Sequence, residues 1–143
     1  SGEIPFWIHF DGLKIPKNAI KAGKEQNQRL FIGRAGHERS LTPGKIYETE
    51  RTCVIPWGTV SNTKTDYEIL VSGSSNWVSA QSGNVPENAF PGGHSEQGET
   101  LYIGRVMHEG QIIVGKVQPS HAVCYIAYGN DELNFSKYEV LVV

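Results

Sequence analysis

The chain has 143 residues, a hydrophobic fraction of 38% and a formal net charge of −2 at pH 7, and this length is enough to bury one substantial core. A nearly neutral chain without a run of Lys and Arg does not attract phosphate backbones, so we expect no nucleic-acid partner. The longest apolar runs are too short to cross a bilayer, and no basic segment followed by an apolar one opens the chain. We therefore expect no membrane insertion and a soluble protein, either cytoplasmic or secreted.

The same unit occurs twice in the chain. Residues 30–45 return 71 positions later as residues 101–116, and both stretches contain Ile-Gly-Arg, His-Glu and Gly-Lys in the same order. Weaker matches on either side extend the two repeats to 5–72 and 75–143. A unit of about 70 residues is marginal on its own, so we expect residues 1–143 to form a single domain. In that domain the repeats share one core around a pseudo-two-fold axis.

Each repeat opens with an aromatic, strand-like segment, at 6–10 and at 76–80, which turn residues close. A proline-containing segment follows in each copy, and proline excludes a central strand. Next come polar stretches at 22–28 and 92–98, in which glycine allows the backbone to turn tightly. We expect both polar stretches to be exposed loops.

The duplicated stretches, 30–45 and 101–116, are each predicted to form a β-hairpin that turns at its His-Glu pair. The most apolar runs in the chain follow these hairpins, at 52–57 and 122–128. Their composition and length are typical of buried strands, so we predict that both lie in the core.

The last part of each repeat contains a polar segment and then an apolar one. Residues 59–66 and 130–137 are predicted loops, and residues 67–71 and 138–142 are predicted closing strands. No segment keeps the apolar spacing of an amphipathic helix for more than one turn, whereas 16 Gly and 7 Pro punctuate the chain. The predicted fold class is therefore all-β, with mostly antiparallel strands.

The sequence contains little that is typical of an active site. It has no nucleophile elbow, phosphate loop or paired-Cys spacing, so we predict no cofactor and no metal. Cys53 and Cys124 occupy equivalent places in apolar runs; buried free thiols are the favoured interpretation, and a bridge between them stays open. The His-Glu pairs at His37 and His108 could act as a metal or hydrolytic site only if both copies converged, so solvated turns are preferred.

A more suggestive set combines cations and acceptors at equivalent positions. Lys45 ends a hairpin arm while Glu25 lies in the preceding polar stretch, and Lys116 corresponds to Lys45 with Ser95 and Glu96 near the position of Glu25. A fixed donor and a fixed acceptor suit the vicinal hydroxyl groups of a sugar, which donate and accept at once. The alternative for each Lys-Glu pair is a surface salt bridge of little consequence.

Several spaced motifs resemble the DM9 repeat. These are Trp-x(8)-Pro-x-Asn-Ala-x(3)-Gly, Leu-Tyr-Ile-Gly-Arg, Pro-Gly-Lys, Tyr-Gly and Tyr-Glu-Val-Leu, in that order. Two tandem copies over nearly the whole chain resemble the small DM9-containing lectins of bivalve molluscs. The resemblance implies an all-β protein, often dimeric, that binds mannose-type glycans and acts in pattern recognition by innate immunity.

The resemblance also implies a binding site. In those lectins an acidic residue after the Asn-Ala segment and the Lys of Pro-Gly-Lys hold the sugar, and these positions correspond to Glu25 and Lys45. The family pattern has Asp where this chain has Glu, which is one methylene longer. The second copy keeps Lys116 but lacks the preceding proline, and its acidic position carries Ser95 with Glu96 beside it.

From these features we expect a non-enzymatic lectin for mannose or mannose-rich glycans on microbial surfaces. Loop residues of the opposite repeat are expected to complete each pocket, and Tyr47 and Trp57 are further candidates for stacking against a sugar. Because single-sugar sites are weak, a homodimer is expected to supply avidity. The main alternative is a membrane-acting or pore-forming-toxin-associated module, since DM9-like repeats also occur attached to toxin-like domains. The absence of a long apolar or amphipathic segment argues against it.

Overall fold

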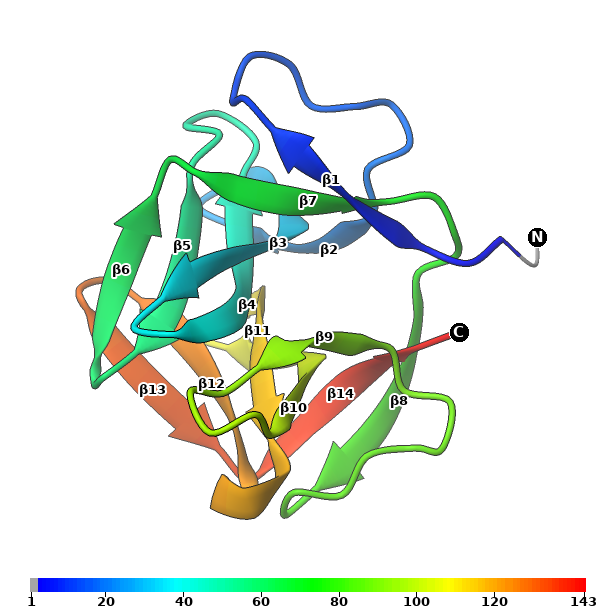
Figure 1. Ribbon diagram of the computed structural model, residues 1–143, viewed down its shortest axis with the longest axis vertical. Helices are drawn as coiled ribbons and strands as arrows, with labels where there is room; N and C mark the ends of the chain where they lie inside the picture. The colour runs from blue at the N-terminus through cyan, green and yellow to red at the C-terminus, as the bar shows by residue number, and fades with distance from the viewer. Residues whose placement is uncertain (1–2) are drawn as a thin grey trace.

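The computed structural model describes residues 3–143, and within them the chain forms a 14-stranded sheet with one short 3-10 turn (Figure 1). The strands of the first repeat are β1 (Phe6–Phe10), β2 (Lys21–Glu25), β3 (Gln28–His37), β4 (Ser40–Tyr47), β5 (Cys53–Trp57), β6 (Val60–Lys64) and β7 (Tyr67–Val71). Those of the second are β8 (Asn76–Gln81), β9 (Pro91–His94), β10 (Thr100–His108), β11 (Gln111–Gln118), β12 (Val123–Tyr128), β13 (Asp131–Phe135) and β14 (Lys137–Val142), with η1 at Pro119–His121. The all-β prediction is confirmed.

The strand order follows the duplication. It runs β1-β7-β3-β2-β11-β12-β13-β6-β5-β4-β9-β10-β14-β8, with β3–β4 and β10–β11 paired as hairpins, and all of these pairings are antiparallel. In Figure 1 the first repeat fills the upper half of the molecule and the second repeat the lower half. Within residues 3–143, three strand pairings join the halves, β2 with β11, β4 with β9, and β6 with β13. The sheet is therefore continuous across the two repeats.

Two predicted loops are strands instead. The polar stretches at 22–28 and 92–98 contain most of β2 and β9, which pair with a hairpin arm of the opposite repeat. Their sequences lack an apolar alternation because each strand is short: β2 buries the side chains of Ala22 and Glu25, and the buried residue of β9 is Gly92. The prediction of exposed loops was wrong because backbone pairing forms these strands, mainly with the neighbouring β3 and β10 and at one residue with the opposite repeat, and polar residues and glycines do not indicate such pairing.

Glycine makes this pairing between repeats possible. A β-carbon on Gly23 would lie 2.1 Å from the backbone oxygen of Ile112, and one on Gly93 would lie 2.0 Å from that of Leu41. Both distances are far below van der Waals contact, so the close approach of β2 to β11 and of β9 to β4 requires residues without a side chain.

The polar segments at 59–66 and 130–137 were also wrongly predicted as loops. They form β6 and β13, which pair with the apolar strands β5 and β12 and meet each other at Val60 and Asp131. Both strands are mostly exposed or half-buried, so their polar composition reflects a solvated face of the sheet.

The hairpins and the apolar strands agree with the prediction. Strands β3 and β4 pair from Leu30 with Tyr47 to His37 with Ser40, and the two turn residues between them have positive φ. The predicted core strands at 52–57 and 122–128 correspond to β5 and β12. The predicted closing strands likewise correspond to β7 and β14.

The interior contains two apolar clusters. The larger one combines residues of both repeats, among them Leu30 and Leu70 from the first and Ile103 from the second. The smaller one belongs to the first repeat. Cys53 lies in the smaller cluster and Cys124 in the larger one; both thiols are free, and burial raises the pKa of each. The bridge that the sequence left open does not form.

Candidate functional site

The structure brings Lys45 and Glu25 together. Nζ of Lys45, in the middle of β4, donates to Oε1 of Glu25 at 2.7 Å and to the backbone oxygen of Ala127 at 2.6 Å. The two side chains are 1% and 3% exposed, so this is a buried ion pair and not the surface salt bridge considered above. Glu25 ends β2, while Ala127 belongs to the second repeat, so the pair also links the halves.

Burial dominates the electrostatics of this pair. Desolvation lowers the pKa of Lys45 below its ordinary value, and the hydrogen bond and charge of Glu25 offset part of that shift. Desolvation also raises the pKa of Tyr47, and the negative charge of Glu25 raises it further. The Lys45 ammonium lies 4.9 Å from the centre of the Tyr47 ring. The three side chains form one polar group in the wall of a cavity.

That cavity has a volume of about 400 Å³ and is mainly polar. It is lined by Glu25, Gln26, Lys45, Tyr47, Glu50, Thr52, Val54, Ser61, Thr63, Gly129 and Asn130. Gly129 and Asn130 belong to the second repeat, as expected for a pocket that the opposite copy completes. Ser61 joins the two repeats at this cavity, because its hydroxyl donates to the backbone oxygen of Gly129 at 2.9 Å.

The matching position in the second repeat is built differently. Lys116 forms its ion pair with Glu132 at 3.8 Å, and the two side chains are 6% and 10% exposed. The Lys116 ammonium lies 5.1 Å from the centre of the Tyr125 ring. Burial again lowers the pKa of this lysine, with Glu132 and Glu96 acting in the opposite direction. Tyr125 occupies the place that Val54 holds in the first repeat.

Ser95 and Glu96 have other contacts. The hydroxyl of Ser95 accepts from the backbone N–H groups of Gln97 and Glu99 at 3.3 and 3.0 Å, and so closes its own turn. Oε2 of Glu96 accepts from the indole of Trp57 at 3.2 Å. A role of Ser95, Glu96 and Lys116 in ligand binding stays a prediction.

The model of the DM9 repeat matches residues 5–61 and 25–135, which together cover most of the chain. The chain belongs to the DM9 repeat family. The resemblance drawn from the motifs is confirmed in this respect, and the two halves of the sheet are tandem DM9 repeats.

Similar proteins include two natterins of Thalassophryne nattereri. Natterin-4 is 28% identical over 144 residues, covering 96% of this chain and 33% of natterin-4. Natterin-3 is 24% identical over 143 residues, covering 96% of this chain and 36% of natterin-3. The chain thus spans about a third of the length of these relatives. The nematode sperm cell motility protein MFP2B shares the fold, with a TM-score of 0.70 at 12% identity over 98% of this chain and 47% of that protein.

The rings of His37 and His108 are half-buried and pack against aromatic side chains. The His37 ring meets Trp57 edge-on at 4.8 Å and its Nδ1 lies 2.8 Å from Nζ of Lys64. Burial, followed by the charge of Lys64, lowers the pKa of His37. The His108 ring meets Tyr128 in the same way at 4.7 Å. The turn residues that follow these histidines are exposed, as expected of solvated turns, whereas the two rings are half-buried.

Of the two aromatic candidates, Tyr47 lines the cavity of the first DM9 repeat, whereas Trp57 packs against His37 and bonds to Glu96. Among residues 3–143, no cluster of three or more His, Cys, Asp or Glu side chains is suited to a metal ion. The same residues include no helix with the length and apolarity that a membrane crossing requires.

Sequence analysis missed the hydroxyl-bearing wall of the cavity. Lys45 lies opposite Val54 across β4 and β5, and Val54 lies opposite Thr63 across β5 and β6. Residues that face each other across antiparallel strands point to the same side of the sheet, which places Thr63 at the cavity. Ser61 and Thr63 are two positions apart and therefore share one face of a strand. This spacing is informative only once residues 60–64 are known to form a strand.

Proposed function

We propose that this DM9 protein is a lectin that binds mannose, or the mannose residues of a glycan, in the cavity of its first repeat. The observation that carries the proposal is the buried Lys45–Glu25 pair in the wall of a polar cavity of about 400 Å³. Among the hydrogen bonds of residues 3–143, Lys45 uses two of its three N–H groups, which leaves one donor for a ligand.

The chemistry of the cavity supports a neutral polyol. Lys45 and Glu25 neutralise each other, so a ligand with a strong net charge gains little from them. The hydroxyls of Thr52 and Thr63 supply groups that both donate and accept, as sugar hydroxyls do. Val54 offers an apolar surface for the C–H face of a pyranose.

Because a single sugar-binding site is weak, a biological role requires several sites that act together. A dissociation constant of about 1 mM corresponds to only about −4 kcal/mol. We propose that a homodimer presents two or more cavities to mannose-rich glycans on microbial surfaces, so that avidity supplies useful affinity and serves pattern recognition in innate immunity. In this proposal the protein binds its ligand without catalysis.

The proposal is tested by calorimetric titration with mannose, using galactose as the control sugar. We expect saturable binding of mannose at about one site per chain, and no heat from galactose. Val54→Tyr is the site-directed variant of choice, because it introduces the residue that the second repeat carries at the same place. Binding of mannose with unchanged affinity by Val54→Tyr would contradict the site. Dye release from lipid vesicles at the same protein concentration would favour the membrane-acting alternative.

A further inference from the structure

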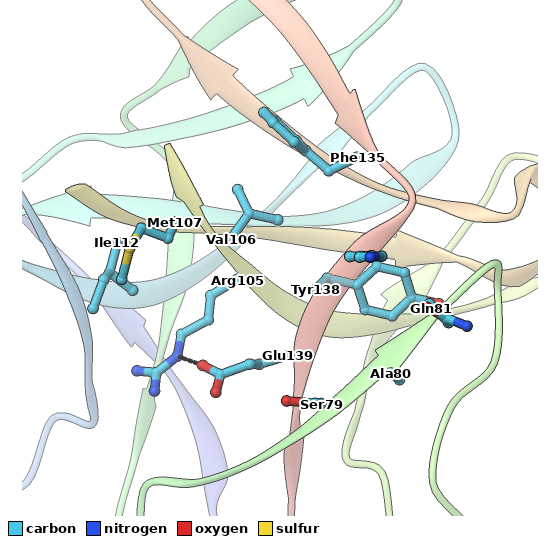
Figure 2. A pocket seen from close by; sticks show the side chains of 11 residues that line it. Ser79, Ala80, Gln81, Arg105, Val106, Met107, Ile112, Phe135, Tyr138 and Glu139 are labelled. Atoms are coloured by element: carbon cyan, nitrogen blue, oxygen red, sulfur yellow. Dashed lines mark hydrogen bonds and ion pairs between the residues drawn. The ribbon is translucent and has the colours of Figure 1, made fainter. Parts of the chain in front are cut away.

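A second cavity, larger than the first, lies in the second DM9 repeat. Its volume is about 580 Å³, and it lies where β8, β10 and β14 come together, with Phe135 of β13 on one side. None of its lining residues belongs to the Lys45 cavity. Figure 2 shows the side chains of Phe135, Val106 and Tyr138 around it, with Arg105 and Glu139 joined at one end.

The pseudo-symmetry explains why the space exists. In the first repeat Phe10 pairs with Tyr67 across β1 and β7, and in the second repeat Ala80 pairs with Tyr138 across β8 and β14. The Phe10 ring is 3% exposed and packs edge-on against Tyr67 with ring centres 5.6 Å apart. Alanine at the same place in the second repeat leaves the volume of a phenyl ring unfilled.

Two further differences make the second-repeat cavity apolar. Phe135 stands where the first repeat has Lys64, and Met107 stands where it has Gly36. Met107 is 72% exposed at the cavity, an unusual position for an apolar side chain of this size. Methionine is flexible and polarisable, so it adapts to apolar ligands of different shape.

The charge at this cavity differs as well. Nε of Arg105 donates to Glu139 at 2.7 Å and Nη1 donates to the backbone oxygen of Ala22 at 3.0 Å, so Arg105 and Glu139 neutralise each other. Among the charged side chains that line the cavity within the described chain, this leaves the exposed Lys137. Its counterpart in the first repeat is Asp66, so the sign of the charge is reversed.

We propose that this cavity binds a small amphiphilic anion, with an aromatic or short apolar body and a carboxylate or sulfonate group. The body lies against Phe135, Val106 and Met107, in the space that Ala80 leaves open, and the anion faces Lys137. The volume is within the usual range for small-molecule sites, and an apolar wall with one charged group is their usual composition. The site is independent of the proposed mannose site.

The probe is 1-anilinonaphthalene-8-sulfonate, whose fused rings and sulfonate match this description. We expect a saturable rise in fluorescence with one site per chain. Met107 is the single methionine of the chain, so methionine labelled in its methyl group gives one NMR signal beside the cavity. That signal is expected to shift in proportion to occupancy because of the ring currents of the bound dye.

Three variants test the assignment. Ala80→Phe restores the residue of the first repeat and is expected to weaken dye binding by about tenfold or more, because its ring fills the cavity. Lys137→Gln removes the charge and is expected to weaken binding by about threefold to tenfold, with a smaller loss at high salt. The matched control is Lys17→Gln, a change of the same kind at an exposed lysine outside this cavity, which is expected to leave binding unchanged.

Each variant is first checked for an unchanged thermal unfolding midpoint and unchanged mannose binding. Dye binding with wild-type affinity by a folded Ala80→Phe protein would overturn the proposal, and so would a Met107 signal that does not move. If Ala80→Phe alters only the sedimentation of the protein, the cavity belongs to a contact between two copies of the chain, and the proposal is wrong.

Discussion

The two DM9 repeats place a buried lysine at the same point of the sheet and surround it differently. In the first repeat a row across three strands reads Lys45, Val54, Thr63, and in the second the equivalent row reads Lys116, Tyr125, Asn134. Valine leaves a polar cavity beside Lys45, whereas Tyr125 lies next to Lys116 and bonds through its hydroxyl to His121 at 2.7 Å. The position beside the lysine thus carries a small apolar side chain at the cavity in the first repeat and an aromatic ring in the second.

The opposite difference occurs at the first strand of each repeat. There the Phe10 ring fills the space beside the strand in the first repeat, whereas Ala80 leaves the equivalent space open in the second. The duplicated frame therefore carries a polar cavity in the first repeat and a mainly apolar one in the second. Because single side chains on equivalent strands make the difference, the repeats can diverge in ligand chemistry while the strand pairing stays the same.

The largest expected effect separates the two lysines. Lys45→Ala leaves Glu25 buried without its partner, and loss of one member of a buried pair costs about 3–5 kcal/mol of stability. Lys116→Ala should cost less, about 1–3 kcal/mol, because Glu132 is more exposed and lies farther from the lysine. Urea unfolding of both variants measures the difference. Equal losses would show that the Lys45 pair has no special role between the repeats.

A control distinguishes charge from packing at this pair. The double variant Lys45→Met with Glu25→Gln removes both charges and is expected to be more stable than Lys45→Ala alone. It should also fail to bind mannose, because the donor of the proposed site is gone. This separates loss of the ligand from loss of the fold.

A second prediction concerns the glycines where the halves meet. Gly23→Ala and Gly93→Ala each place a methyl group against a backbone oxygen of the other repeat, at about 2 Å. We expect a loss of about 1–3 kcal/mol for each, since the strands must separate. Thermal unfolding measures both. A loss at one glycine alone would mean that the two contacts between the repeats are not equivalent.

The third prediction exchanges the residues beside the lysines. Val54→Tyr is expected to weaken mannose binding by about tenfold or more, equivalent to about 1.4 kcal/mol. Tyr125→Val should uncover Lys116 and raise the stoichiometry towards two sites per chain in calorimetry. If Tyr125→Val leaves the stoichiometry at one, then Glu132 and not Tyr125 closes the second site.

The smallest expected effect concerns Cys53 and Cys124, which are buried at equivalent positions of the two repeats. The pKa of Cys53 and of Cys124 is raised by burial from an ordinary value of 9.0, so the folded protein keeps both thiol protons above the pH at which the unfolded chain loses them. Their stabilising contribution is complete below the unfolded pKa and is lost as the pH rises above it. At about pH 9.5, loss of each thiol proton in the unfolded chain should lower the free energy of unfolding by about 1 kcal/mol.

Comparison of urea unfolding at neutral and alkaline pH isolates this effect. Cys53→Ala and Cys124→Ala should each remove a similar part of the alkaline loss, since both thiols are fully buried in equivalent strands. An unequal change would show that one half opens before the other at high pH.

Much of the fold could be predicted from the sequence, because it rests on local signals. The duplication, the hairpins and the apolar strands β5, β7, β12 and β14 follow from residue pattern and turn chemistry. The predictions failed at β2 and β6, and at their equivalents β9 and β13. These four strands are short and polar, and each contacts a strand of the other repeat. Each is held mainly by backbone pairing with a neighbouring strand of its own repeat and at one further residue by the other repeat, and their polar residues do not indicate this pairing.

The site divides in the same way. Sequence by itself determined that Lys45 and Glu25 belong together, because their types and their recurrence in a DM9-like pattern indicate a polar pair. Only the tertiary structure decided that the pair is buried, that Ala127 of the other repeat holds it and that Val54 lies beside it at a polar cavity, whereas Tyr125 lies beside Lys116. The physical reason is that burial and access depend on the packing of residues far apart in the chain, whereas residue type and spacing do not.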